Sequence, residues 1–183
     1  GNRHDPYSDI GMVSAQGGKI INLTNSGYTS GSPRWVLDGN AILFITERYG
    51  MRAHASWGSL NDVMLVFMNQ DAYDKFRLSK EDYELQKELE KEQKNTTEAK
   101  KNDKKKGDNK EKSEEKKEEK VKDIVVELNN IEDRIVRLTP NSSDLGSAII
   151  TKDGETLYYL SAFEGGYDLW KMNLRKKDTK LLH

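Results

Sequence analysis

The chain has 183 residues, 33% of them charged and 34% hydrophobic, and its formal net charge is −1. A nearly neutral chain has no global field that would attract nucleic acid or an anionic membrane, and its longest apolar run, residues 63–68, is too short to span a bilayer. The absence of cysteine excludes disulfides and thiolate metal sites, and three histidines scattered at positions 4, 54 and 183 do not suggest a zinc site, so we expect no metal and no cofactor.

The first part of the chain carries five segments with strand-like patterns. They are DIGMVSA (9–15), KIINLT (19–24), SPRWVL (32–37), AILFIT (41–46) and DVMLVFM (62–68). Asp38-Gly39 lies between the third and the fourth, and this pair readily takes the positive φ angles of a two-residue hairpin. The fourth segment is apolar on both faces, which is typical of a strand packed between two neighbours.

A charged insertion follows. Residues 80–122 hold 15 Lys and 14 Asp or Glu, so the other 140 residues keep about the quarter of charged residues that globular domains carry. DAYDKFRL (71–78) predicts a helix, and Ser79 followed by Asp82 resembles the start of another. Apolar residues become rare after Leu89, so we expect the helix to fade there into a mobile, self-neutralising tether.

Strand patterns resume after the insertion. RIVRLT (134–139) predicts one strand, which DIVVEL (123–128) would extend. Four more follow, with Asp153-Gly154 between the first two: GSAIIT (146–151), TLYYLSA (156–162), YDLWKMNL (167–174) and DTKLL (178–182).

These segments form an internal repeat. KIINLT and RIVRLT lie 115 residues apart, and the same offset places Asp38-Gly39 on Asp153-Gly154 and Gly50 on Gly165. A second spacing of 44 residues separates Leu138 from Leu182, which end equivalent strands. Strands that recur every 40–50 residues indicate a β-propeller with one four-stranded blade per repeat.

We therefore predict an all-β fold, a partial β-propeller of about two and a half four-stranded antiparallel blades with a charged, partly helical insertion. Because propellers close with 4–8 blades, we expect the rest of the ring outside this sequence, unless copies associate. The predicted parts are the third and fourth strands of a preceding blade with a connection (1–30), a split blade (31–69 and 123–140), the insertion (70–122) and a final blade (141–183).

The segment SPRWVLDGNAILFITERYG (32–50) resembles the propeller repeats of tricorn proteases and TolB, although Val36-Leu37 replaces the usual Ser-Pro. Residues 51–88 with the Lys/Glu tract, and residues 130–174, resemble the tricorn-like serine peptidases of Bacteroidetes, in the tail-specific or C-terminal-processing family. The resemblance covers nearly the whole chain.

The resemblance implies a non-catalytic propeller segment of an exported peptidase of the periplasm or cell envelope. Such a segment would bind or guide a peptide or an unfolded protein toward a catalytic domain outside this chain, next to the remaining propeller and a PDZ module. None of the family's catalytic residues map onto this sequence. The alternative is a TolB-like propeller that docks proteins without protease activity. Association of copies of this chain into a homo-oligomer is also compatible with the sequence, whereas we do not expect nucleic acid as a partner.

The long loop 51–61 is the best candidate for a binding site because Arg52, His54 and Trp57 are residue types suited to peptide contacts. The alternative is structural, with Trp57 packed over the blade edge and Arg52 paired with a carboxylate. His54 lies beside Ser56 and Ser59, but we expect these residues to shape the loop rather than to form a catalytic dyad.

Two further sets of residues have a structural interpretation. Asp62 and Asp168 open equivalent strands, which favours a repeated hydrogen-bonding role over metal binding. Aromatic residues within the strands are expected to fill the layers between blades: Trp35, Phe44, Tyr158, Tyr159 and Trp170.

Overall fold

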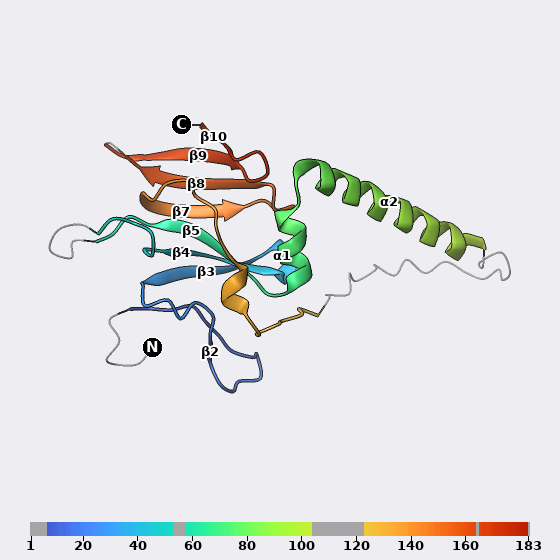
Figure 1. The fold of residues 1–183 in the computed structure, drawn as a ribbon, viewed down its shortest axis with the longest axis horizontal. Coiled ribbons are helices and arrows are strands. Elements are labelled where there is room, and N and C mark those ends of the chain that lie inside the picture. Colours follow the sequence, from blue (N-terminus) through green and yellow to red (C-terminus); the bar gives the residue numbers. More distant parts are fainter. Residues whose placement is uncertain (1–6, 53–57, 104–122, 164, 183) are drawn as a thin grey trace, which may run out of the picture. The chain divides into compact units, whose positions relative to one another are not determined.

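The structure is a computed structural model, and it describes residues 7–52, 58–103, 123–163 and 165–182 (Figure 1). The chain divides into two compact units. The first unit spans Gly1–Phe76 and Ile124–His183, and the second spans Arg77–Asp123.

The centre of the first unit is a four-stranded antiparallel sheet, the middle blade. Its strands are ordered β3 (Ser30–Val36), β4 (Ala41–Thr46), β5 (Asp62–Phe67) and β6 (Ile135–Arg137). β5 and β6 are neighbours although the insertion separates them in sequence. The predicted split blade is therefore a single sheet.

A second four-stranded antiparallel sheet, the last blade, consists of β7 (Asp144–Ile150), β8 (Thr156–Ala162), β9 (Tyr167–Asn173) and β10 (Asp178–Leu181). Near the N-terminus, β1 (Gly11–Met12) and β2 (Ile21–Asn22) form a two-stranded antiparallel sheet. These sheets correspond to the two blades and the half blade predicted from the repeat.

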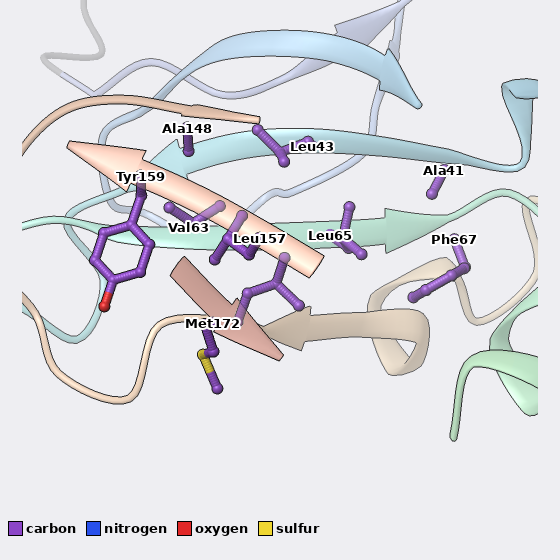
Figure 2. Packing of buried hydrophobic residues seen from close by; sticks show 10 residues of the cluster. Ala41, Leu43, Val63, Leu65, Phe67, Ala148, Leu157, Tyr159 and Met172 are labelled. Carbon is purple, nitrogen blue, oxygen red and sulfur yellow. The ribbon is translucent and has the colours of Figure 1, made fainter. Parts of the chain in front are cut away.

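The core between the middle and last blades is apolar. Successive side chains of a strand point to opposite faces, so alternate residues of β4 and β5 share the face turned to the last blade. On the middle blade these alternate residues are Ala41, Leu43, Val63, Leu65 and Phe67. They pack against Ala148, Leu157, Tyr159 and Met172 of the last blade (Figure 2). Full burial of a valine, leucine, phenylalanine or methionine side chain contributes about 1.5–3 kcal/mol.

The opposite face of the middle blade is buried as well. Ile42, Phe44, Met64 and Val66 alternate with the residues above and pack with Ile10 and Leu23 beside the β1–β2 sheet. β4 and β5 are thus buried on both faces, as the apolar pattern of AILFIT predicts.

Two predictions about connections are wrong. Val36 pairs with Ala41, so four residues, not two, join β3 to β4, and Leu37, Asp38 and Gly39 all have positive φ angles of 54°, 53° and 85°. The segment DIVVEL does not extend β6 as a strand. It passes the end of β5 instead, where the amide of Glu127 donates to the carbonyl of Met68 at 2.8 Å.

The insertion begins with α1 (Gln70–Arg77), which belongs almost entirely to the first unit. Asn69 caps it, because its Oδ1 accepts the amide hydrogen of Ala72 at 2.9 Å. The rings of Tyr73 and Phe76 then lie 5.7 and 5.0 Å from the ring of Phe67, so α1 covers one end of the core.

The second unit contains α2 (Lys80–Asp103), which starts where predicted: the Ser79 hydroxyl accepts the amide hydrogen of Asp82 at 3.1 Å. The helix continues 14 residues beyond Leu89, where the sequence predicts fading, since Lys, Glu and Gln are themselves good helix formers. The remainder of the predicted tether, residues 104–122, lies outside the described residues. No described helix is long and apolar enough to cross a membrane.

Candidate functional site

The two described arms of the loop between β4 and β5 form the base of a hairpin at one end of the blades, the end that also carries the β8–β9 connection (Figure 1). We call this the loop end. At the hairpin base the amide of Leu60 donates to the carbonyl of Met51 at 3.1 Å, and Arg52 pairs with Ser59. Gly50 is required there, because a Cβ at this position would lie 1.7 Å from the carbonyl oxygen of Leu60.

Arg52 connects this hairpin to two tyrosines from other segments. Its guanidinium carbon lies 5.6 Å from the ring centroid of Tyr7 and 5.8 Å from that of Tyr28, within the range of cation–π attraction. A hydrogen bond to the Tyr7 hydroxyl, together with nearby charges, raises the pKa of Arg52. The guanidinium therefore remains a fixed cation between two aromatic rings.

Glu47 holds Arg52 in this position. Its Oε1 lies 3.4 Å from Nη2 of Arg52 and accepts the amide hydrogen of Thr29 at 3.2 Å. Burial by itself would raise the pKa of Glu47, but hydrogen bonds from Thr29 and Ser59 and the charge of Arg52 outweigh it and keep the pKa below its usual value. The carboxylate is thus charged at neutral pH, and its side chain is only 16% exposed.

A second arginine–tyrosine group lies on the same loop end. The ring centroid of Tyr49 is 5.5 Å from the guanidinium carbon of Arg48 and 5.3 Å from that of Arg137. Arg137 comes from β6, on the far side of the insertion. The pairing of β5 with β6, in which Met64 lies opposite Arg137, brings it to this end of the blade.

A buried carboxylate fixes Arg137. Asp62, whose side chain is fully buried, lies 2.8 Å from Nη2 of Arg137. Thr139 and Ser142 donate hydroxyl hydrogens to the same carboxylate at 2.8 and 2.7 Å. Asp62 therefore has the hydrogen-bonding role that its position predicts, whereas Asp168 is only partly buried.

Together these contacts define an exposed surface of three tyrosines and three arginines, the Tyr–Arg surface: Tyr7, Tyr28, Arg48, Tyr49, Arg52 and Arg137. Arg52 pairs with the carboxylate of Glu47, as the structural alternative predicts. Its side chain is nevertheless 50% exposed and faces solvent. His54 and Trp57 lie outside the described residues, as does Ser56.

Sequence reasoning missed five of these six residues. Arg48 and Tyr49 lie in the segment 32–50, just after the end of β4. Their position in the loop after a strand could therefore have identified them as candidate binding residues. Tyr7, Tyr28 and Arg137 carried no such signal. Only the packing of the N-terminal segment and the register of β6 bring them to the loop end.

The prediction for the strand aromatics holds in part. Phe44 and Tyr159 are buried, and Trp170 packs against the core in a partly buried position. Tyr158 is partly buried on the opposite face of its blade, where it lines a hollow instead of the core. Trp35 is 49% exposed, and there the prediction is wrong. The β1–β2 sheet covers Phe44 but does not reach the part of β3 that carries Trp35.

Among the residues that the structure describes, no group of three or more His, Asp or Glu side chains could hold a metal ion. The loop end combines charged, aromatic and hydroxyl groups on a rigid sheet. Its chemistry suits binding.

No protein-family model matches this sequence, and neither does any curated protein sequence. Solved structures that are similar in fold include the following two. TolB from Acinetobacter baumannii is 9% identical with a TM-score of 0.50, and the match covers 96% of this chain and 26% of TolB. The tricorn protease is 10% identical with a TM-score of 0.55, and the match covers 98% of this chain and 16% of the protease.

These similarities confirm the partial β-propeller fold. The chain spans about a quarter of the TolB chain and about a sixth of the tricorn protease chain. At such low identity the likeness concerns the fold alone.

Proposed function

We propose that this chain is a non-catalytic propeller segment that binds extended peptides or unfolded protein at its loop end, within a larger tricorn-like serine peptidase of a bacterial cell envelope. The observation that carries the proposal is the Tyr–Arg surface. Tyrosine and arginine, together with tryptophan, are the residues enriched where binding energy concentrates in protein interfaces.

The surface is also preorganised. Glu47 holds Arg52, and Asp62 with Ser142 holds Arg137, so both guanidiniums are ordered before a ligand arrives. Binding then costs less side-chain entropy than it would on free arginines. The buried β4 and β5 give the loop end a rigid support.

No part of the chain that the structure describes covers the second face of the last blade, which supports a role within a larger ring. Ile149, Tyr158, Leu160 and Leu169 line a shallow apolar hollow of about 200 Å³ on that face. In the internal repeat Tyr158 corresponds to Leu43, and the last blade buries Leu43 in the middle blade. We propose that a further blade of the same type covers the uncovered face in the same way.

Photo-crosslinking tests the binding role. A photoreactive phenylalanine derivative in place of Tyr49 should crosslink a reduced, carboxymethylated protein that cannot fold, and the same derivative in place of Lys152, at the other end of the blades, should not. The incubated substrate should remain uncleaved. Crosslinking of a folded protein in preference to the unfolded one would favour the docking alternative, and cleavage of the substrate would contradict a non-catalytic role.

A further inference from the structure

We propose that the Tyr–Arg surface selects peptide segments that carry aspartate or glutamate side chains, with Arg48 as the residue that determines this specificity. The inference rests on the proposed peptide binding and names the class of peptide. It follows from the distribution of charge over the three arginines.

Two of the three arginines are compensated by carboxylates. Glu47 lies at ion-pair distance from Arg52, and the buried Asp62 from Arg137. In the described part of the chain, Arg48 has no such carboxylate. Its guanidinium carbon lies 5.5 Å from the Tyr49 ring, and its main-chain amide donates to Thr46.

Arg48 therefore leaves an excess positive charge beside an exposed aromatic ring. A carboxylate that approaches it gains a charge-assisted hydrogen bond, and apolar atoms next to that carboxylate can cover the Tyr49 ring. Arg137, whose guanidinium carbon lies 5.3 Å from the centroid of the same ring, adds to the positive field there, and Asp62 and Ser142 hold it in place.

The openness of the site favours a side-chain carboxylate over a chain terminus. Recognition of a terminal carboxylate typically uses a nest of main-chain amides that closes around the end of the chain. Arg48 instead borders a hollow of only about 10 Å³, about the size of one water molecule, between β4, β5 and the segment before β3. An extended segment can run across such a surface and present its acidic side chains to Arg48.

The charge balance also argues against nucleic acid. Tyrosine and arginine can stack on bases, but a phosphate backbone requires several uncompensated cations, and the described surface has one. A short acidic peptide matches that single excess charge.

A nuclear magnetic resonance titration of the 15N-labelled chain tests the inference. The probes are two nonapeptides with acetylated N-termini and amidated C-termini, one with three glutamates spaced among tyrosine and serine, the other with glutamines in their place. We expect the glutamate peptide to shift the amides of residues 47–52 and to bind about fivefold more tightly. Arg48→Gln should abolish that difference, Arg48→Lys should retain most of it, and Lys152→Gln, the same charge change at the other end of the blades, should leave it intact.

Equal affinity for the two peptides would overturn the acidic specificity while leaving peptide binding in place. The absence of shifts with either peptide would overturn both proposals. Binding of the glutamine peptide with a free C-terminal carboxylate as tightly as the glutamate peptide would assign Arg48 to chain termini, and tighter binding of a thymidine decanucleotide would assign the surface to nucleic acid. Either result contradicts the inference.

Discussion

Two aspartates form the same pattern of hydrogen bonds at the ends of their strand pairs. Asp62, at the start of β5, accepts the hydroxyl hydrogen of Thr139 at 2.8 Å, and Asp9, just before β1, accepts that of Thr24 at 2.8 Å. Each threonine hydroxyl in turn accepts the amide hydrogen of the residue after the aspartate, at 3.2 and 3.1 Å. The repeat thus preserves a hydrogen-bonded carboxylate where two strands end.

Asp62→Asn should destabilise the chain by about 2–3 kcal/mol, because the guanidinium of Arg137 loses its counter-charge and two hydroxyl donors lose a charged acceptor. Urea unfolding at pH 7 measures the change. Asp38→Asn is the control: its ion pair with Lys152 is exposed, with side chains 70% and 84% accessible, and should contribute less than about 0.5 kcal/mol. Similar small losses in both variants would show that the Asp62 network does not stabilise the blade.

Glu47 should make stability depend on acid pH. Its folded-state pKa lies below the ordinary value of 4.5, so its contribution is fully present above about pH 4.5 and is lost as the pH falls through the folded-state value. Glu47→Gln should therefore be less stable than the natural chain at pH 7, and the two stabilities should converge toward pH 3. Thermal unfolding across this range measures the difference.

Asp9 should also make the stability of the chain depend on acid pH, independently of Glu47. Hydrogen bonds from Asn22, Thr24 and Ser26 outweigh the effect of burial and lower its pKa too, so some acid dependence should persist in Glu47→Gln. Parallel stability curves for the two proteins would contradict the role assigned to Glu47.

Among the elements, the hairpin between β4 and β5 depends on one close contact. Gly50 approaches the Leu60 carbonyl so closely that no side chain fits between them, and the pairing of Arg52 with Ser59 lies just beyond. The position of Arg52 on the Tyr–Arg surface follows from this contact.

Gly50→Ala should open the hairpin base while leaving the sheet intact, because the added methyl group forces the two arms apart. Hydrogen exchange of the Leu60 amide, which donates to Met51, should accelerate at least tenfold, and exchange within β4 and β5 should not change. Gly31→Ala, where a Cβ meets no atom within 4 Å, is the matched control. Unchanged exchange at Leu60 would show that the arms adjust without separating.

The two ends of the insertion are held together by an arginine. Arg134 is buried and donates to the carbonyls of Phe67, Asn129 and Glu127, while the carboxylate of Glu127 accepts the first amide hydrogen of α1 at 2.9 Å. The start of α1 and the segment that returns from the insertion are thereby fixed to the end of β5. The blade can carry a long insertion because both of its ends are bound at one place.

Arg134→Met should cost about 2–4 kcal/mol, because the buried carbonyl of Phe67 and two partly buried carbonyls lose their donor. Urea unfolding measures that loss, and the Glu127 amide, bonded to Met68, should exchange faster in the variant. Arg34→Met, on the exposed side of β3, should change neither quantity. A loss below about 1 kcal/mol would mean that the carbonyls find other donors.

At the scale of the whole chain, the two faces of the last blade differ. One face is buried against the middle blade, and the other exposes Ile149 and Leu160. Exposed apolar patches of this kind mark surfaces that another layer normally covers.

The double variant Ile149→Lys/Leu160→Lys should reduce the fluorescence of the dye ANS bound to the chain by about half, because it interrupts the exposed apolar patch. Its unfolding midpoint should change little, since neither residue contributes to the core between the blades. Leu181→Lys, at an exposed position of β10, should have a smaller effect on the dye. Undiminished fluorescence would place the dye elsewhere and remove this support for a covering blade.

The sequence by itself determined the strands and their grouping into blades. The alternation in AILFIT depends on neighbouring residues alone, and the 115-residue offset relates KIINLT to RIVRLT across the insertion. These local patterns also predicted the cap at Ser79 and the hydrogen-bonding role of Asp62, because a cap and a repeated strand start are recognisable within a few residues.

Only the tertiary structure decided which residues share the loop end. Tyr49 and Arg137 meet because β6 pairs with β5 in one register, and a shift by one residue would turn Arg137 to the opposite face. The same holds for Trp35, which the sequence places in a core strand and the structure exposes, because burial depends on whether a neighbouring sheet reaches it. Register and sheet coverage depend on contacts between distant segments, whereas the patterns that predicted the blades are properties of single strands.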